Sequence, residues 1–357
     1  MASTSNPRLL IAASGTGGHL FPALAVAQQL TDYRIDWLGV PDRLEHKLVP
    51  QDYPLHIVNF EGLQTRPNLK TLIIFWRFLV AIWQVRSLLK QGEFAAVFTT
   101  GGYIAGPAIW GAKLAGIPVI LHESNLMPGK ITRWFGAQCQ TVAIGFPGSS
   151  RFLPRSQTTW VGTPVRQEFH DPRLLTLPIP PEAPLIVIAG GSQGAVSVNR
   201  LVRSAASDWF EAGAYVVHLT GDRDPDAESL IHPQYFRLAF FDNMPALLAR
   251  ATLAVSRAGA GTITELAFTQ TPAILIPYPY AADDHQSYNA QAMVDAGAAL
   301  LFPQSELTSP ILSKTVLDLL AQPTQLEAMA KACDQIAVKD SAEQLAYLVR
   351  QSVTGTH

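Results

Sequence analysis

Short apolar runs recur along this chain, and most of them end in glycine. Continuous apolar runs of this length are typical of strands that are buried on both faces of a parallel sheet. Each run is followed by a glycine-rich loop and then by a segment with helical periodicity, as at residues 20–30 and 263–268. The clearest strands are expected at residues 8–14, 94–100, 184–189 and 252–256. The pattern predicts an α/β fold in which helices cover parallel sheets.

The succession of strand, loop and helix begins at residue 8 and begins again at residue 184. A chain of 357 residues is also too long for one ordinary core. We therefore predict two Rossmann-like domains, residues 1–162 and 163–340. Their sheets are expected to face a common cleft, because open parallel sheets bind ligands beyond the carboxyl ends of their strands. Periodicity leaves open whether the last helix, near residues 342–352, closes the second domain or returns to the first.

The stretch from residue 69 to residue 89 is apolar almost all round a helix. The 15 residues between Lys70 and Arg86 include Arg77 and Gln84, and they fall short of the ~20 apolar residues that a membrane span needs. A spanning helix is therefore not expected. Two alternatives remain, a buried core helix and a helix that dips one face into a membrane surface. Tryptophans beside basic residues suit the second.

Composition narrows the classes of function. Hydrophobic residues make up 48% of the chain and charged residues 15%, which excludes a disordered protein. A formal charge of -2 argues against duplex nucleic acid as a partner, because phosphate binding needs concentrated Lys and Arg. The N-terminus lacks the basic and apolar regions of a signal peptide. Cys139 and Cys333 have no metal-binding spacing and are expected to be buried and reduced.

The first glycine loop, from Gly15 to His19, is not a dinucleotide fingerprint, because Leu20 stands where the third glycine belongs. It is either a tight turn without a ligand or a turn whose backbone N–H groups approach an anion or a sugar at a helix N-terminus. His19 stands at the start of that helix. It is either a capping, hydrogen-bonded histidine or a general base or phosphate contact.

Two loops in the second half have the same character. Residues 190–195 combine glycines with Ser192 and Gln193 after a strand, which suits a diphosphate cradle. Glu265 follows Thr262 by three residues. This spacing fits a capping box with Thr262 as the N-cap, or a carboxylate in the first helical turn that accepts hydrogen bonds from ribose hydroxyls.

Three further polar clusters need a function or a structural reason. Residues 283–286 and Asn289 either bind sugar hydroxyls or form a polar helix cap. Asn125 either lies at the rim of the binding site or forms an Asx-turn. Asp222, Asp224 and Asp226 resemble the DxD metal motif of another glycosyltransferase architecture, but no further ligand is in sight, so no metal is expected. Since no G-x-S-x-G elbow is present, a hydrolase triad is not expected either.

Taken together, the motifs at residues 15–23, 101–107, 122–125, 162–166, 190–195, 256–265 and 284–290 have a recognisable order and spacing. Over nearly its full length the chain resembles the N-acetylglucosaminyltransferase family of bacterial peptidoglycan synthesis. The resemblance implies a GT-B fold of two Rossmann-like domains, with residues 341–357 joining the N-terminal one. It implies inverting transfer of GlcNAc from UDP-GlcNAc to the C4 hydroxyl of MurNAc in undecaprenyl-linked lipid I, which forms lipid II. No cofactor is implied, and Mg²⁺ is not required.

The resemblance also implies site residues. Glu265 would hold the ribose, the backbone of Phe241 the uracil edge and Arg166 the nucleotide side of the cleft. The diphosphate would lie on Ser192 and the backbone of the second-domain loops, and the GlcNAc hydroxyls on Asn125, His285 and Gln286. The donor set is Thr16, Gly17, Gly18, Asn125, Arg166, Ser192, Gln193, Phe241, Ala260, Gly261, Glu265, His285 and Gln286. The acceptor set is Gly15, His19, Gly101, Gly102 and Tyr103, with His19 as the candidate base.

The family docks on the cytoplasmic face of the inner membrane, which makes a peripheral location the expectation here. The membrane residues would be Ile73, Phe75, Trp76, Leu79 and Trp83, and other cell-wall synthesis proteins are possible partners, with roles in cell shape and cell division. Three positions depart from the family pattern: Ser124 replaces a usual Gln, Thr163 a usual Asn, and His285 a Gln found in some members.

Two other functions fit parts of the pattern. UDP-GlcNAc 2-epimerases share the two-domain layout and the nucleotide sugar, but they need carboxylates for acid and base chemistry and no lipid acceptor. The apolar helix with basic neighbours and the loop at Gly15 speak against them. A UDP-sugar-binding scaffold protein without activity is the second alternative, and the intact polar groups in every loop argue against it.

Overall fold

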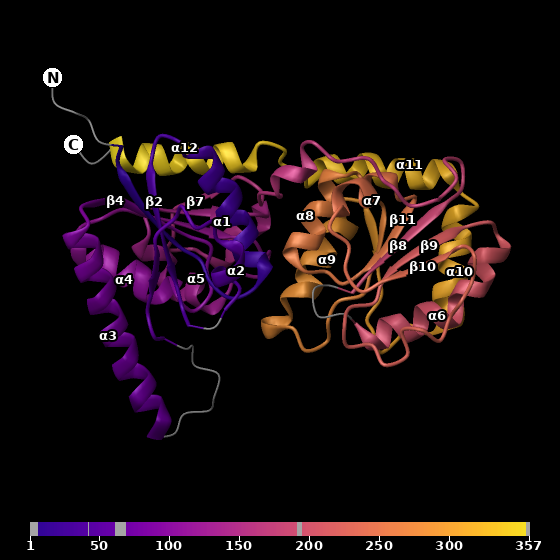
Figure 1. Ribbon diagram of the computed structural model, residues 1–357, viewed down its shortest axis with the longest axis horizontal. Helices are drawn as coiled ribbons and strands as arrows, with labels where there is room; N and C mark the ends of the chain where they lie inside the picture. Colours follow the sequence, from indigo (N-terminus) through magenta and orange to yellow (C-terminus); the bar gives the residue numbers. More distant parts are fainter. Residues whose placement is uncertain (1–5, 42, 61–68, 191–194, 355–357) are drawn as a thin grey trace. The chain divides into compact units, whose positions relative to one another are not determined.

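The computed structural model describes residues 6–41, 43–60, 69–190 and 195–354, with the side chains of residues 69–71 excepted. The chain divides into two compact units. The first unit is Met1–Arg166 with Asp340–His357, and the second unit is Gln167–Lys339. Each unit contains one sheet in which all neighbouring strands are parallel, as the apolar runs predict (Figure 1).

The sheet of the first unit has the order β3-β2-β1-β4-β5-β6-β7. Its strands are β1 (Arg8–Ala12), β2 (Arg34–Gly39), β3 (Leu55–Ile57), β4 (Phe94–Thr99), β5 (Val119–Glu123), β6 (Thr141–Ile144) and β7 (Thr158–Trp160). Its helices are α1 (Gly17–Gln29), α2 (Glu45–Leu48), α3 (Leu69–Gln91), α4 (Ala105–Ala115), α5 (Lys130–Phe135) and α12 (Ser341–Thr354), with short 3₁₀ helices η1 (Gly136–Gln138) and η2 (Pro147–Phe152).

Alternate residues of β1 reach opposite faces of this sheet, and both faces are covered. Leu9 and Ile11 pack with side chains of α1 and α12. Leu10 and Ala12 pack with side chains of α3 and α4 on the other face. Burial on both faces explains why the strand is a continuous apolar run in the sequence.

Helix α12 belongs to the first unit, where it lies against α1 (Figure 1). Leu345, Ala346 and Val349 are completely buried in the core that contains β1. Arg350 adds an ion pair with Asp32 at 2.6 Å. The chain therefore leaves the first unit, builds the second, and returns with its last helix to complete the first.

The sheet of the second unit has the order β10-β9-β8-β11-β12-β13. Its strands are β8 (Leu185–Ala189), β9 (Tyr215–Leu219), β10 (Tyr235–Leu238), β11 (Leu253–Ser256), β12 (Ala273–Leu275) and β13 (Ala299–Leu301). Its helices are α6 (Val196–Glu211), α7 (Met244–Arg250), α8 (Ala260–Phe268), α9 (His285–Asp295), α10 (Ser309–Leu320) and α11 (Pro323–Ala332), with 3₁₀ helices η3 (Gln167–Phe169), η4 (Ala282–Asp284) and η5 (Cys333–Gln335). Ile186 and Ile188 of β8 pack with α6 and α10 in its core.

A buried polar network explains Asp224, the middle one of the three aspartates that resemble a metal motif. Asp224 accepts hydrogen bonds from Arg203 at 2.7 Å and from Asn199 at 2.7 Å. His218 donates from Nε2 to Asn199 and accepts from the Tyr235 hydroxyl at Nδ1. Burial lowers the pKa of His218 to about 3, so the imidazole is neutral at pH 7. Within the described residues no three His, Cys, Asp or Glu side chains form a metal site, and Asp224 serves to anchor its loop.

Helix α3 is buried along only part of its length. Ala81, Ile82, Val85 and Leu89 are buried, and a Cβ added to Gly111 of α4 would lie 2.8 Å from Val85, so the missing side chain lets the two helices approach closely. The N-terminal half of α3 projects from the first unit (Figure 1). By length and composition alone, the stretch Leu72–Gln91 is long and apolar enough to cross a membrane. This differs from the sequence-based expectation, which counted too few apolar residues between Lys70 and Arg86 for a membrane span. Only 22% of an 18-residue window in it is buried, so the core-helix alternative holds for the C-terminal half of α3 and not for the whole helix.

Both cysteines are free thiols. Cys333 is buried and Cys139 is partly buried. Burial raises the pKa of each thiol to about 12, so neither is a reactive thiolate near neutral pH. The expectation of buried cysteines is confirmed for Cys333.

Candidate functional site

The strand order of each sheet reverses at one point. In the first unit the reversal lies between β1 and β4, and in the second between β8 and β11. Ligands of open parallel sheets bind beyond the carboxyl ends of the strands at such a point. The loops that follow these four strands are the four glycine loops of the sequence, so each unit carries a pair of them where its sheet is expected to bind a ligand.

The loop after β1 turns at Gly15, whose φ of +104° lies in the left-handed region that favours glycine. Helix α1 then begins at Gly17, three residues earlier than the sequence pattern predicts. No side chain caps it in the described structure, and its first turn holds no acidic residue. The first N–H groups of a helix have no partner within the helix. The N–H groups near Gly17 and Gly18, next to the exposed Thr16, are therefore suited to an anion.

His19 is held between the two glycine loops of the first unit. Its Nδ1 lies 2.7 Å from the carbonyl oxygen of Thr100, and the Thr100 hydroxyl donates to the His19 carbonyl at 2.9 Å. A carbonyl oxygen can only accept, so Nδ1 carries the hydrogen and Nε2 of the neutral ring has a lone pair. Gly101 and Gly102 follow Thr100 with φ of +91° and +74°. A Cβ on either would lie 3.6 Å from the His19 ring, so the glycine loop lies directly on the imidazole.

The residues predicted for the acceptor are thus brought together. Gly15, Gly101 and Gly102 occupy the adjacent loops at the reversal between β1 and β4, and His19 lies beside them in the first turn of α1. Tyr103 follows in the same loop and is 45% exposed, which leaves its ring accessible to a ligand.

Asn125 is fixed by a carboxylate that sequence reasoning did not single out. Glu123, at the end of β5, is buried and accepts from the Asn125 backbone N–H at 3.0 Å and from its side-chain amide at 3.2 Å. It also accepts from Gly129 and Thr132 at the start of α5.

Arg166 lies in the first unit rather than in the predicted second domain, with its guanidinium 5.1 Å from the ring of Phe21.

In the second unit, α6 follows β8 and α8 follows β11. These two strands are neighbours in the sheet, so the two helices begin at the same edge of it. In the described part of the chain neither helix has a side-chain cap or an acidic residue in its first turn. Helix α8 begins at Ala260 after Gly259, so Ala260 and Gly261 present their N–H groups there, and the capping box with Thr262 is wrong. Glu265 lies in the second turn, not the first. Ser192 and Gln193 lie outside the described residues.

A buried cation accompanies these helix ends. Arg257 is 7% exposed, and it donates to the carbonyl oxygens of Ile276 and Pro277 and to the side-chain oxygen of Gln304. Among the ion pairs of the described residues none includes Arg257. Burial lowers the pKa of this guanidinium, which nevertheless stays charged. Arg257 follows β11 directly, and its guanidinium also lies 3.4 Å from the hydroxyl oxygen of Ser197, so the positive charge lies beside the first turn of α6.

The polar cluster before α9 has defined hydrogen-bonding roles. Gln286 accepts at Oε1 from the N–H groups of Ala258 and Tyr278, so toward a ligand its side chain can only donate. His285 donates from Nδ1 to Ala282, which leaves Nε2 to accept. Asn289 is buried and donates to Ala258, so it supports the loop.

Phe241, the residue predicted for the uracil edge, is half-buried in the loop between β10 and α7. The structure therefore puts Phe241 on a loop of the second unit, and it puts Ala260, Gly261, His285 and Gln286 in the first turns of α8 and α9 of the same unit. It puts Asn125 and Arg166 on the first unit, together with Thr16, Gly17 and Gly18.

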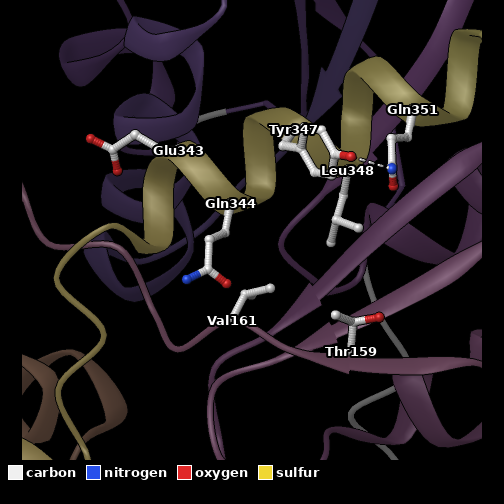
Figure 2. A pocket seen from close by; sticks show the side chains of 7 residues that line it. All are labelled: Thr159, Val161, Glu343, Gln344, Tyr347, Leu348 and Gln351. Atoms are coloured by element: carbon white, nitrogen blue, oxygen red, sulfur yellow. Dashed lines mark hydrogen bonds between the residues drawn. The ribbon is translucent and has the colours of Figure 1, made fainter.

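The first unit also has a shallow hollow beside β7 and α12 (Figure 2). Tyr347 and Gln351 share a hydrogen bond of 2.7 Å at its edge. None of the predicted site residues lines it; the lining residues are Thr159, Val161, Glu343, Gln344, Tyr347, Leu348 and Gln351.

Comparison with known proteins gives a consistent picture. Residues 9–144 match the N-terminal domain model of glycosyltransferase family 28, and residues 185–345 match its C-terminal domain model. A protein of Gloeothece citriformis named UDP-N-acetylglucosamine--N-acetylmuramyl-(pentapeptide) pyrophosphoryl-undecaprenol N-acetylglucosamine transferase is 62% identical over 96% of this chain and 95% of its own. A protein of Synechocystis with the same name is 62% identical over 97% of this chain and 98% of its own. The crystal structure of Acinetobacter baumannii MurG superimposes with a TM-score of 0.80 at 29% identity, covering 97% of this chain and 99% of that one.

Proposed function

This chain belongs to glycosyltransferase family 28, and on that premise we infer that it transfers N-acetylglucosamine from UDP-GlcNAc to N-acetylmuramyl-(pentapeptide) pyrophosphoryl-undecaprenol. The product is lipid II, the membrane-bound precursor of peptidoglycan. Near-full-length identity of about 60% to curated relatives with that name carries this conclusion. The fold agrees with it, since the two parallel sheets are those of a GT-B glycosyltransferase.

The donor diphosphate is assigned to the second unit. It would lie on the first N–H groups of α6 and α8, which have no partner within their own helices and lie where the helix dipoles favour negative charge. Arg257 would strengthen this attraction, because no carboxylate ion pair neutralises it among the described residues. The same groups stabilise the charge that grows on UDP as the sugar leaves. Sugar hydroxyls would accept from Gln286 and donate to Nε2 of His285.

Glu265 is assigned to the ribose, and the variant Glu265→Ala should raise the KM for UDP-GlcNAc by about 10- to 100-fold, since hydrogen bonds to a charged group contribute about 1.5–3 kcal/mol. Steady-state kinetics at saturating acceptor measures this. Glu306→Ala, an exposed carboxylate of the same unit, is the matched control. An unchanged KM in Glu265→Ala would remove this residue from the ribose site.

The acceptor is assigned to the glycine loops of the first unit, with His19 as the general base. The C4 hydroxyl of MurNAc attacks the anomeric carbon of the donor, its proton passes to Nε2 of His19, and the bond to UDP breaks. A single displacement inverts the anomeric configuration. Thr100 fixes the tautomer that this role needs, because its carbonyl oxygen holds the hydrogen at Nδ1.

We propose a peripheral location on the cytoplasmic face of the inner membrane, because a soluble nucleotide sugar must meet an acceptor on a lipid. The exposed face of α3 is the proposed contact. Phe75, Trp76 and Trp83 are 57%, 67% and 64% exposed there. The Arg86 guanidinium lies 5.0 Å from the Trp83 ring, an arrangement suited to an aromatic ring at the level of anionic headgroups. Association with other cell-wall synthesis proteins, and roles in cell division and shape, follow from this location as proposals.

The double variant Trp76→Ser/Trp83→Ser should bind anionic lipid vesicles at least about 100-fold more weakly, since burying each large apolar side chain is worth about 1.5–3 kcal/mol. Cosedimentation with vesicles measures the binding. Tyr347→Ser, which removes a 59% exposed aromatic ring from α12 of the same unit, should bind as the unaltered protein does. Equal binding by all three proteins would exclude α3 as the membrane contact.

The transfer itself is tested with radiolabelled UDP-GlcNAc and a short-chain analogue of the lipid acceptor. Label that enters the lipid phase only when acceptor is present supports the transferase. Conversion of UDP-GlcNAc to UDP-ManNAc without acceptor would instead identify an epimerase, and binding without turnover a scaffold. The expectation that Mg²⁺ is not required stays a prediction, and the same reaction run with a chelator tests it.

A further inference from the structure

Glu45 is a buried carboxylate beneath the first glycine loop. It opens the single-turn helix α2 and is completely buried. Its Oε1 accepts from the Ser14 hydroxyl at 2.6 Å and from the Val40 N–H at 2.9 Å. Its Oε2 accepts from the Gly15 N–H at 3.3 Å. One side chain therefore joins the residues that follow β1 to the residue that follows β2.

The surroundings are shaped to admit this carboxylate. Gly39, the last residue of β2, lies so close that an added Cβ would be 2.8 Å from Oε1 of Glu45. Among the described residues no ion pair includes Glu45, so its hydrogen-bond donors are neutral groups. A buried carboxylate is costly unless its oxygens are hydrogen-bonded, so this arrangement makes the conformation of the loop and the position of Glu45 depend on each other.

The bond to Gly15 lies at the point where the chain changes direction. Gly15 has a φ of +104°, and α1 begins two residues later with His19 in its first turn. Thr100 holds the His19 ring from the β4 side. Glu45 of α2 and Thr100, which follows β4, thus fix the loop and the imidazole from two different segments of the first unit.

We propose that Glu45 is the positioning residue of the glycine loop, and that it sets the placement of His19 for proton transfer without touching either substrate. This inference rests on the proposed function. It concerns the acceptor loop of the first unit, whereas the diphosphate and ribose of UDP-GlcNAc are assigned to the second unit. The affinity for UDP-GlcNAc should therefore depend on Glu45 far less than kcat does, although Thr16, Gly17 and Gly18 of the predicted donor set lie in this loop.

The variant Glu45→Gln tests the proposal because it keeps the shape of the side chain. The amide oxygen can replace Oε1, which serves two donors, and the NH₂ group then faces the Gly15 N–H, where two donors meet. We expect kcat to fall by about 10- to 100-fold, the size of loss that a displacement of about 1 Å causes. The KD for UDP-GlcNAc should rise by less than the loss in kcat, and amide hydrogen exchange should rise at residues 15–20. Glu343→Gln, an exposed carboxylate on α12, is the matched control.

A second variant displaces the same carboxylate without removing its charge. Gly39→Ala places a methyl group against Glu45 at a strand position that alanine also adopts. We expect the same pattern: a lower kcat, a smaller change in the affinity for UDP-GlcNAc, and faster exchange in the loop. If Glu45→Gln does not fold, the kcat and the hydrogen exchange of Gly39→Ala test the proposal instead.

A double-mutant cycle with His19→Ala separates positioning from general stabilisation. If Glu45 acts through His19, the loss in Glu45→Gln should largely disappear when His19 is already absent. Undiminished kcat in a folded variant, or losses that add fully in the double variant, would overturn the proposal. Absence of transfer by the unaltered protein would count against the proposed function instead, so the two failures are distinguishable.

Discussion

Replacing His19 with alanine is expected to lower kcat by about 10²- to 10⁴-fold, the usual contribution of a general base, while the affinity for UDP-GlcNAc stays the same. The structure explains why this histidine is suited to the role. Its Nδ1–H is committed to the carbonyl oxygen of Thr100, and Nε2 is left to accept a proton. Single-turnover measurements with both substrates bound would report the chemical step directly.

Two isosteric variants test this assignment more finely. In His19→Asn the side-chain amide can still donate to Thr100, but nothing replaces Nε2, so we expect activity as low as in His19→Ala. In His19→Gln an amide nitrogen lies near the place of Nε2, yet it cannot accept a proton, and activity should again be low. A loss of less than tenfold in all three variants would exclude His19 as the base.

Removing α12 should prevent the first unit from folding, although this helix is last in the chain. Within α12, Leu345→Ala is expected to destabilise the first unit by about 2–5 kcal/mol, the usual effect of truncating a completely buried leucine. Denaturant unfolding, followed by hydrogen exchange in β1 and β4, measures the change. The β8 and β11 amides of the second unit should keep their protection.

A control on the same helix is available. Tyr347 is 59% exposed, and Tyr347→Ala should change the stability by less than about 1 kcal/mol. If the two variants were equally destabilised, the packing of α12 against the β1 core would not be what stabilises the first unit.

The strands and the glycine loops were predictable because they rest on local patterns. Residues 8–14 and 94–100 contain β1 and β4, and the loops that follow them lie where the sheet order reverses. The first turns of the helices were not predictable in the same way. Helix α1 begins at Gly17 and α8 at Ala260, inside glycine-rich segments that helix propensity disfavours, so the apolar periodicity started the predicted helices too late.

The groups that support the site were missed for a different reason. Glu45 lies about 30 residues from the Gly15 that it binds, and nothing in the local sequence distinguishes it from an exposed glutamate on a short helix. Arg257 was visible within a motif, but its burial depends on carbonyl oxygens about 20 residues away. The apolar stretch of α3 likewise could not be assigned to core or surface, because periodicity records which side chains are apolar and not what covers them.

The return of α12 to the first unit also orders events during synthesis on the ribosome. The first unit is translated first, yet its core stays incomplete until the whole second unit has been made and residues 341–354 have followed. At bacterial elongation rates of about 5–20 residues per second that interval lasts about 10–40 s. Throughout it, the apolar face that Leu345 and Val349 later cover is open to chaperones and to aggregation. The N-terminal half of this protein is therefore the half that finishes folding last.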